Sequence, residues 1–127
     1  MTTAHEIRSL ANRWLYTRYK YGGGDHNGID CSHFVQEILK EAGHANAPYV
    51  QAKDISRSHL YSRISPAEVR EGDIVHFSRG DDHMGIVSDA KAGIFIGAQT
   101  TNGVSPESYV QGYWSGMRPT FYRYVGD

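Results

Sequence analysis

The single cysteine of this 127-residue chain lies where a thiol could act as a nucleophile. Cys31 follows the glycine-rich stretch 22–28 and precedes apolar residues at helical spacing. Asp30 is a favourable N-cap residue, so Cys31 is expected at the first position of a helix. Unpaired backbone N–H groups and the helix dipole favour the nucleophilic thiolate there. The sequence therefore predicts either a catalytic cysteine or a small apolar side chain that only fills space.

A cysteine nucleophile needs a base, usually a histidine within hydrogen-bonding distance. Among the seven histidines, His83 fits best because it begins a predicted strand after a polar turn. Gly85 shares the strand face of His83 and is expected to leave room for the helix start or for a substrate. His76, inside the preceding strand, is the competing candidate, with a half-buried structural histidine as the alternative. His33 follows Cys31 by two residues and is expected to point away from the thiol.

The elements that must position these residues are helices first and strands second. Apolar residues recur at helical spacing over 4–18 and over 30–42, and Gly43 fits the left-handed position after the second helix. Short, turn-rich links favour antiparallel pairing. The predicted elements further along are a short helix within 48–61 and strands at 74–78, 83–88, 94–99 and 119–125; residues 107–114 show no clear pattern. The expected fold class is α+β, with N-terminal helices packed on an antiparallel sheet.

The composition narrows the classes of function. A formal net charge of −1 gives no electrostatic case for a nucleic acid or a membrane surface as partner. No stretch approaches the roughly 18 apolar residues of a membrane span. One cysteine excludes an internal disulfide and a multi-cysteine zinc site, and no histidine spacing is typical of a metal site, so neither metal nor cofactor is expected. The length fits one domain over 1–127.

Four motifs in register resemble the NlpC-type cell-wall peptidases. An aromatic-rich glycine turn, with Tyr19 and 21–23, leads to Asp-Cys-Ser at 30–32. Residues 72–77 match a strand that begins with Gly-Asp and ends with Phe. His-Met-Gly-Ile follows at 83–86, and the last motif, a small residue followed by Gly-Val, is matched at 102–104. The resemblance covers about residues 10–115. It implies a papain-like fold and cleavage of peptidoglycan stem peptides, usually between D-γ-glutamate and a diamino acid such as meso-diaminopimelate.

At one position the sequence departs from this family. The family places a second histidine, which orients the base, where this chain has Gly97. Gln99 lies two residues further and hence on the same strand face. Its amide oxygen could accept the imidazole N–H of His83, as an Asn does in papain-like triads. Gln99 is therefore the predicted third catalytic residue beside Cys31 and His83, with a backbone carbonyl or Asp89 as alternatives.

The resemblance assigns smaller roles to three residues around the cysteine. Tyr19 is expected to line the site and to support the oxyanion. The alternative is that it only packs as an aromatic residue at a helix end. Asp30 and Ser32 are expected to contact the polar end of the stem peptide, and Asp30 can serve as N-cap at the same time. The backbone N–H of Cys31 is the expected oxyanion donor.

Other functions fit the same residues. A CHAP-type N-acetylmuramoyl-L-alanine amidase, or another papain-like acyl hydrolase, would keep the thiol chemistry and change the bond. A non-catalytic binding module is a further alternative, for which Gly97 is the evidence. The N-terminal residues lack a basic segment followed by an apolar block, so no ordinary signal peptide is expected. A cell-wall hydrolase would then be delivered by a secretion machine, a phage particle or lysis, with an immunity protein or that particle as a partner.

Overall fold

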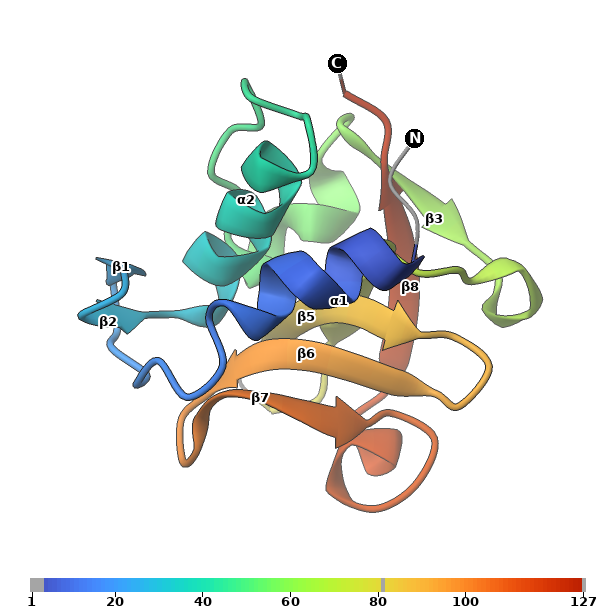
Figure 1. The fold of residues 1–127 in the computed structure, drawn as a ribbon. Helices are drawn as coiled ribbons and strands as arrows, with labels where there is room; N and C mark the ends of the chain where they lie inside the picture. Colours follow the sequence, from blue (N-terminus) through green and yellow to red (C-terminus); the bar gives the residue numbers. More distant parts are fainter. Residues whose placement is uncertain (1–3, 81, 127) are drawn as a thin grey trace.

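The protein, described here by a computed structural model for residues 4–80 and 82–126, packs helices against one antiparallel sheet (Figure 1). The six strands lie in the order β3-β8-β4-β5-β6-β7, and β1 and β2 form a separate small hairpin. This arrangement confirms the predicted α+β class. The elements are α1 (Ala4–Asn12), β1 (Gly24–Asp25), β2 (Gly28–Ile29), α2 (Cys31–Glu41), η1 (Ala52–Arg57), β3 (Tyr61–Ile64), η2 (Pro66–Glu68), β4 (Ile74–Phe77), β5 (His83–Asp89), β6 (Ile94–Gln99), β7 (Gly103–Ser108), η3 (Tyr113–Gly116) and β8 (Pro119–Tyr124).

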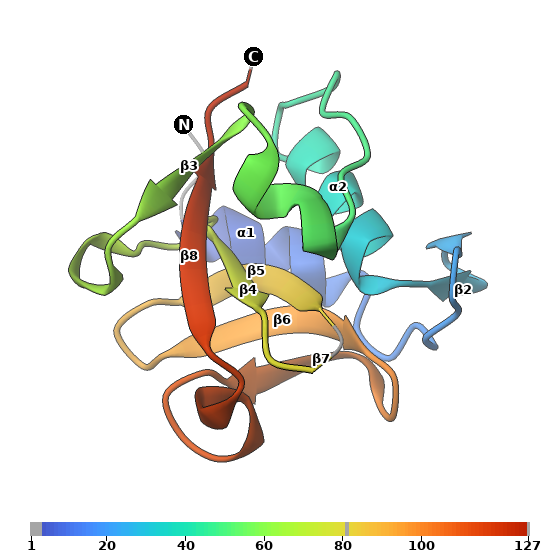
Figure 2. The same cartoon turned by 180° about the vertical axis from the view of Figure 1, so that it is seen from behind.

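Each face of the sheet carries its own apolar cluster, because side chains alternate between the faces of a strand. The helix-side cluster joins α1 and α2 to one face, and Met84 and Ile86 of β5 belong to it. The opposite cluster lies on the other face, where Val87 and Phe95 pack with Tyr109. Figure 2 shows the segment around η3 at this second side, beyond the end of β7. Residues on β5 therefore face either the helices or the η3 segment.

Helix α2 forms as predicted, within one residue at each end. Asp30 is extended and its carboxylate accepts the backbone N–H of His33, which makes it an N-cap. Gly43 follows the helix with a φ of 110°, in the left-handed region that favours glycine. The buried face contains the apolar residues that the spacing indicated, Phe34, Val35, Ile38 and Leu39. The cap thus fixes Cys31 at the first helical position.

The first helix is shorter than predicted, because the chain turns toward β7 after Asn12. Tyr16 adopts a positive φ of 67°, and its N–H donates to the carbonyl of Val104 at 2.8 Å. The carbonyl of Thr17 accepts the N–H of Val104 at 2.9 Å. Trp14 remains buried and donates to Glu41 at 3.0 Å, so its apolar spacing reflects packing of a turn rather than further helix.

The four predicted strands are found as β4, β5, β6 and β8, and η1 is the short helix expected within 48–61. Two strands of the six-stranded sheet, β3 and β7, are missing from the sequence prediction, as are the two short strands β1 and β2 of the hairpin. Each of β3 and β7 is an edge strand with one neighbour in the sheet. Alternation is weak in both, and β7 contains Pro106, which an edge position tolerates because one side of the strand needs no ladder hydrogen bond.

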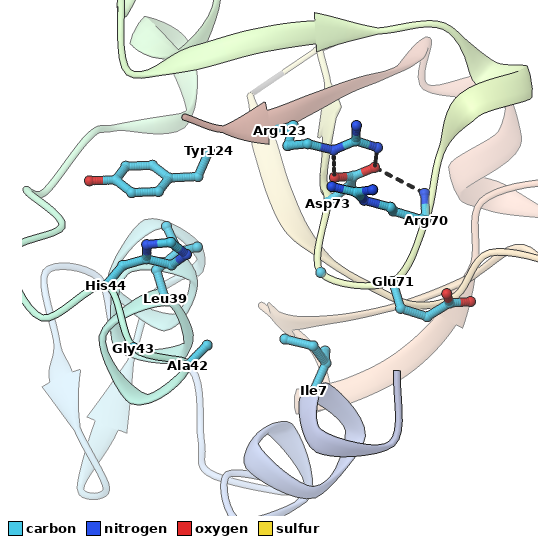
Figure 3. A pocket seen from close by; sticks show the side chains of 11 residues that line it. Ile7, Leu39, Ala42, Gly43, His44, Arg70, Glu71, Asp73, Arg123 and Tyr124 are labelled. Carbon is cyan, nitrogen blue, oxygen red and sulfur yellow. Dashed lines mark hydrogen bonds and ion pairs between the residues drawn. The ribbon is translucent and has the colours of Figure 1, made fainter. Parts of the chain in front are cut away.

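The Gly72-Asp73 motif joins the start of β4 to the end of β8. Asp73 is 2% exposed and accepts both Nε and Nη2 of Arg123, at 2.8 and 2.9 Å, together with the backbone N–H of Arg70 at 2.9 Å (Figure 3). Gly72 has a φ of 93°, and its N–H donates to the carbonyl of Val87 at 2.9 Å. The pocket of about 550 Å³ beside this ion pair lies among α1, α2 and β8, and Cys31 is not among its lining residues.

Asp73→Asn is expected to lower the free energy of unfolding by about 3 kcal/mol, because it leaves the Arg123 guanidinium without its buried carboxylate. Urea denaturation would measure this. The matched control is Asp54→Asn, since Asp54 pairs with Arg57 at an exposed position and should change stability by less than about 0.5 kcal/mol. Equal losses in the two variants would contradict a structural role for the motif.

Candidate active site

Cys31 is the first residue of α2, and the start of this helix lies beside the start of β5 (Figure 2). Its Sγ is 3.8 Å from the hydroxyl of Ser32, and the backbone of Met84 forms a hydrogen bond to it. Because Met84 directly follows His83, the predicted nucleophile and the predicted base are on adjoining parts of two different elements. The helix start also presents unpaired backbone N–H groups beside the thiol.

His83 and Gln99 form the hydrogen bond that the sequence predicted. The Nε2 atom of His83 is 2.8 Å from Oε1 of Gln99, and both side chains are buried. The other end of the Gln99 amide donates to the carbonyl oxygen of Ser105 at 2.8 Å, which fixes the orientation of the amide. Gln99 therefore presents its acceptor oxygen to the ring, so Nε2 of His83 carries the proton and Nδ1 keeps its lone pair.

Gly97 explains how glutamine can occupy this place. A Cβ atom at residue 97 would lie 2.8 Å from Oε1 of Gln99 and 3.2 Å from the ring of Phe95. The glycine therefore leaves the space that the Gln99 side chain fills. Asp89, the alternative third residue, lies at the opposite end of β5 and pairs with Arg8 at 3.4 Å. Gln99, two residues further along β6, thus takes the position next to His83 that the family fills with a histidine at the place of Gly97.

The imidazole of His83 lies on the face of β5 opposite α2, so the expectation that this face meets the helix start is wrong. Its ring stacks on Trp114 at 4.7 Å and also contacts Phe77 and Phe95. The reason proposed for Gly85 fails as well, because an added Cβ would meet the Phe95 ring at 2.5 Å rather than a helix or a substrate. His83 is the first residue of its strand and directly precedes Met84, whose backbone bonds to the thiol.

Burial keeps both reacting groups neutral. It raises the pKa of the Cys31 thiol above its ordinary value of 9.0, and the hydrogen bonds from Ser32 and Met84 offset this only in part. Burial likewise lowers the pKa of His83 to about 4, against the opposing effect of its bond to Gln99. Burial therefore opposes the thiolate that the helix start is predicted to favour. A neutral imidazole is suited to remove the thiol proton as a general base.

A cleft of about 440 Å³ opens beside Cys31 and includes all three residues predicted to bind substrate, Tyr19, Asp30 and Ser32. Burial, and then the charges of Cys31 and Asp30, raise the pKa of the Tyr19 phenol, which lines the same cleft as the thiol. Sequence reasoning missed four other lining residues, Tyr21, Tyr49, Lys53 and Asp82. Tyr21 lies in the glycine turn, Tyr49 and Lys53 lie just before and within η1, and Asp82 lies between β4 and β5.

Asp30 and Ser32 use their polar atoms within the protein. The Asp30 carboxylate accepts the backbone N–H groups of Gly22 and His33 at 2.9 and 2.8 Å and contacts Nδ1 of His33 at 2.8 Å. The Ser32 hydroxyl accepts the N–H of Ala52 at 3.1 Å. These bonds attach the glycine turn and η1 to the start of α2, so both residues shape the cleft walls. The ring of His33 stacks on Tyr49, a lining residue of the cleft, with ring centroids 4.1 Å apart.

His76, the competing candidate for the base, forms a hydrogen bond with Asp82. Its ring is buried, and Nε2 lies 2.8 Å from the carboxylate of Asp82, which lines the cleft.

Within residues 4–80 and 82–126, no three His, Cys, Asp or Glu side chains gather to hold a metal ion. The described helices are too short or too polar to cross a membrane.

Comparison with known proteins gives a consistent result. A sequence model of the NlpC/P60 family matches residues 16–121. A probable endopeptidase NlpC homolog of Haemophilus influenzae is 34% identical over 109 residues, which cover 86% of this chain and 56% of the relative. The murein DD-endopeptidase MepS/murein LD-carboxypeptidase of Escherichia coli is 32% identical over 103 residues, covering 80% of this chain and 52% of the relative. The chain thus spans about half the length of these relatives.

A solved structure supports the fold. The NlpC/p60 domain of the peptidoglycan hydrolase SagA superposes with a TM-score of 0.71 at 22% identity, covering 95% of this chain and 97% of that domain. This likeness establishes the papain-like α+β fold that the sequence resemblance implied.

Gly97→Ala is expected to destabilise the protein by about 1–3 kcal/mol, because its methyl group would overlap the Gln99 amide. The cost should fall in a Gln99→Ala background, where the overlapping atom is gone. Urea denaturation of the two single variants and the double variant measures this coupling. Gly116→Ala is the matched control, since a Cβ there meets no atom within 4 Å. A cost for Gly97→Ala that is the same in both backgrounds would refute the account of this glycine.

Proposed function

The chain belongs to the NlpC/P60 family, and we propose that it is a cysteine endopeptidase that hydrolyses an amide bond in peptidoglycan stem peptides. The observation that carries this proposal is the buried hydrogen bond between His83 and Gln99, because His83 directly precedes Met84, whose backbone bonds to the Cys31 thiol at the helix start. A thiol, a base and an orienting amide in this order suit nucleophilic attack on an acyl carbon. The endopeptidase names of the two relatives support peptidoglycan as the substrate.

The reaction begins from the neutral pair. Nδ1 of His83 takes the Cys31 proton as Sγ attacks the amide carbon, and the oxyanion is held by backbone N–H groups at the start of α2, with the Tyr19 hydroxyl nearby. The imidazolium then gives its proton to the leaving nitrogen, the C–N bond breaks, and a thioester remains on Sγ. Water, activated by His83, hydrolyses the thioester and restores the thiol. Gln99 holds the ring through Nε2 during both proton transfers.

The proposed bond joins D-γ-glutamate to a diamino acid such as meso-diaminopimelate. Lys53 supports this assignment because it adds a positive charge to the cleft, where the α-carboxylate of a γ-linked glutamate would lie. The Escherichia coli relative is named for DD-endopeptidase and LD-carboxypeptidase activities, which act on other bonds. Analysis of the products therefore has to identify the bond.

Two alternatives receive different support. An amidase of the CHAP type would use the same thiol and differ in its products. A non-catalytic module is less consistent with the structure, because Gln99 occupies the place of the orienting group that Gly97 lacks. An immunity protein or phage particle as partner, and delivery by an injection machine, stay predictions of the sequence.

Cys31→Ala and His83→Ala should each abolish digestion of purified sacculi, since they remove the nucleophile and the base. His59→Ala, at an exposed position, is the control and should digest at the wild-type rate. Mass spectrometry of the products should show new diamino-acid N-termini. Free stem peptides beginning with L-alanine would instead indicate the amidase, and full digestion by Cys31→Ala would overturn the proposed mechanism.

A further inference from the structure

A second cavity, of about 420 Å³, adjoins the His83 imidazole. Two of its lining residues are Gln99 and Trp114, which hydrogen-bond and stack on that ring. Among the described residues, it shares no lining residue with the cleft that contains Cys31. Its volume lies within the range of about 300–1,000 Å³ that is typical of small-molecule sites. The second cavity is therefore next to residues that hold the His83 ring, whereas the first contains the thiol.

The reaction assigns different halves of a substrate to these cavities. The acyl carbon must lie at Sγ of Cys31, so the acyl half occupies the cleft beside α2. The leaving nitrogen must come within hydrogen-bonding distance of His83, because that residue supplies its proton. The leaving half then continues past the imidazole toward Trp114, where the second cavity begins.

The side chains of the second cavity suit a cationic group. Glu107 pairs with Phe95 in the β6–β7 register, as Gly103 does with Gln99, so its carboxylate is on the sheet face that carries Gln99. Within the described part of the chain, no ion pair occupies this carboxylate. Tyr113 and Trp114 meet edge to face at 4.9 Å in the same cavity. A carboxylate beside two aromatic rings is a favourable environment for an ammonium group.

The remaining lining residues could bind the other end of an amino acid. Thr100, Thr101 and Asn102 are exposed in the link between β6 and β7, and their side chains offer hydroxyl and amide donors. The hydroxyl and amide donors could bind the carboxylate of an amino-acid residue, and the Glu107 carboxylate could bind its ammonium. Figure 1 shows this link at one end of β7, and Glu107 lies near the other end of that strand.

We propose that this cavity is the leaving-group site and that Glu107 pairs with a second, free ammonium on the leaving residue. The proposal rests on the endopeptidase function proposed above. It assigns the substrate class as a stem peptide whose diamino acid keeps its distal amino group free. A stem peptide that is cross-linked through that amino group lacks the charge and binds less well.

Two synthetic peptides test the proposal, both with a γ-D-glutamyl–meso-diaminopimelate bond. In one the distal amino group is free, and in the other it is acetylated. The wild-type protein should cleave the free form with a kcat/KM about five- to tenfold higher. Glu107→Gln should remove this preference by slowing cleavage of the free form alone, whereas the control Glu37→Gln, on the surface of α2, should keep it. Equal cleavage of both peptides by the wild type, or an equal loss on both in Glu107→Gln, would overturn the proposal.

A binding measurement separates this proposal from the proposed function. Free meso-diaminopimelate is titrated into ¹⁵N-labelled Cys31→Ala protein while the indole N–H signal of Trp114, assigned with Trp114→Phe, is followed. A saturable shift that is lost in the Cys31→Ala, Glu107→Gln double variant supports the site. If this shift is seen but neither peptide is cleaved, the endopeptidase function is contradicted and the binding site is not. The absence of a shift overturns the site.

Discussion

The buried hydrogen bond between His83 and Gln99 is the interaction on which the rest of the site depends. Four residues on three strands are needed to make it. Strand β5 supplies His83 at its first residue and β6 supplies Gln99 at its last. Ser105 of β7 holds the far end of the amide, and Gly97 leaves the space that the glutamine fills. The bond selects one tautomer of the imidazole and directs its free nitrogen to the reaction.

The same burial that isolates this bond sets the charge state of the site. A thiol and an imidazole removed from water both lose stabilisation of their charged forms, so the pKa of Cys31 rises and that of His83 falls. The N–H groups at the start of α2 then stabilise charge mainly when it develops during attack, on the oxyanion, rather than in the resting thiol. Trp114 contributes to this burial through its stack on the ring.

The sequence was sufficient for the local parts of this description. An N-cap, a left-handed glycine and apolar spacing depend on neighbouring residues, and they located α2, with Cys31 at its start. The motif resemblance located His83, and strand alternation located Gln99. What failed depends on distant residues: β7 lies at an edge with weak alternation, Trp114 reaches His83 from a segment without a pattern, and burial outweighs the helix start in the pKa of Cys31.

The central claim is that Gln99 holds a neutral, Nε2-protonated imidazole beside a protonated thiol. NMR titration of ¹⁵N-labelled histidine in the free protein measures this directly. Burial lowers the pKa of His83, so the ring should be neutral at pH 7, should gain its proton only as the pH falls through about 4, and should carry its neutral-state proton on Nε2. An imidazolium that persists at pH 7, or a neutral ring protonated on Nδ1, would contradict the account.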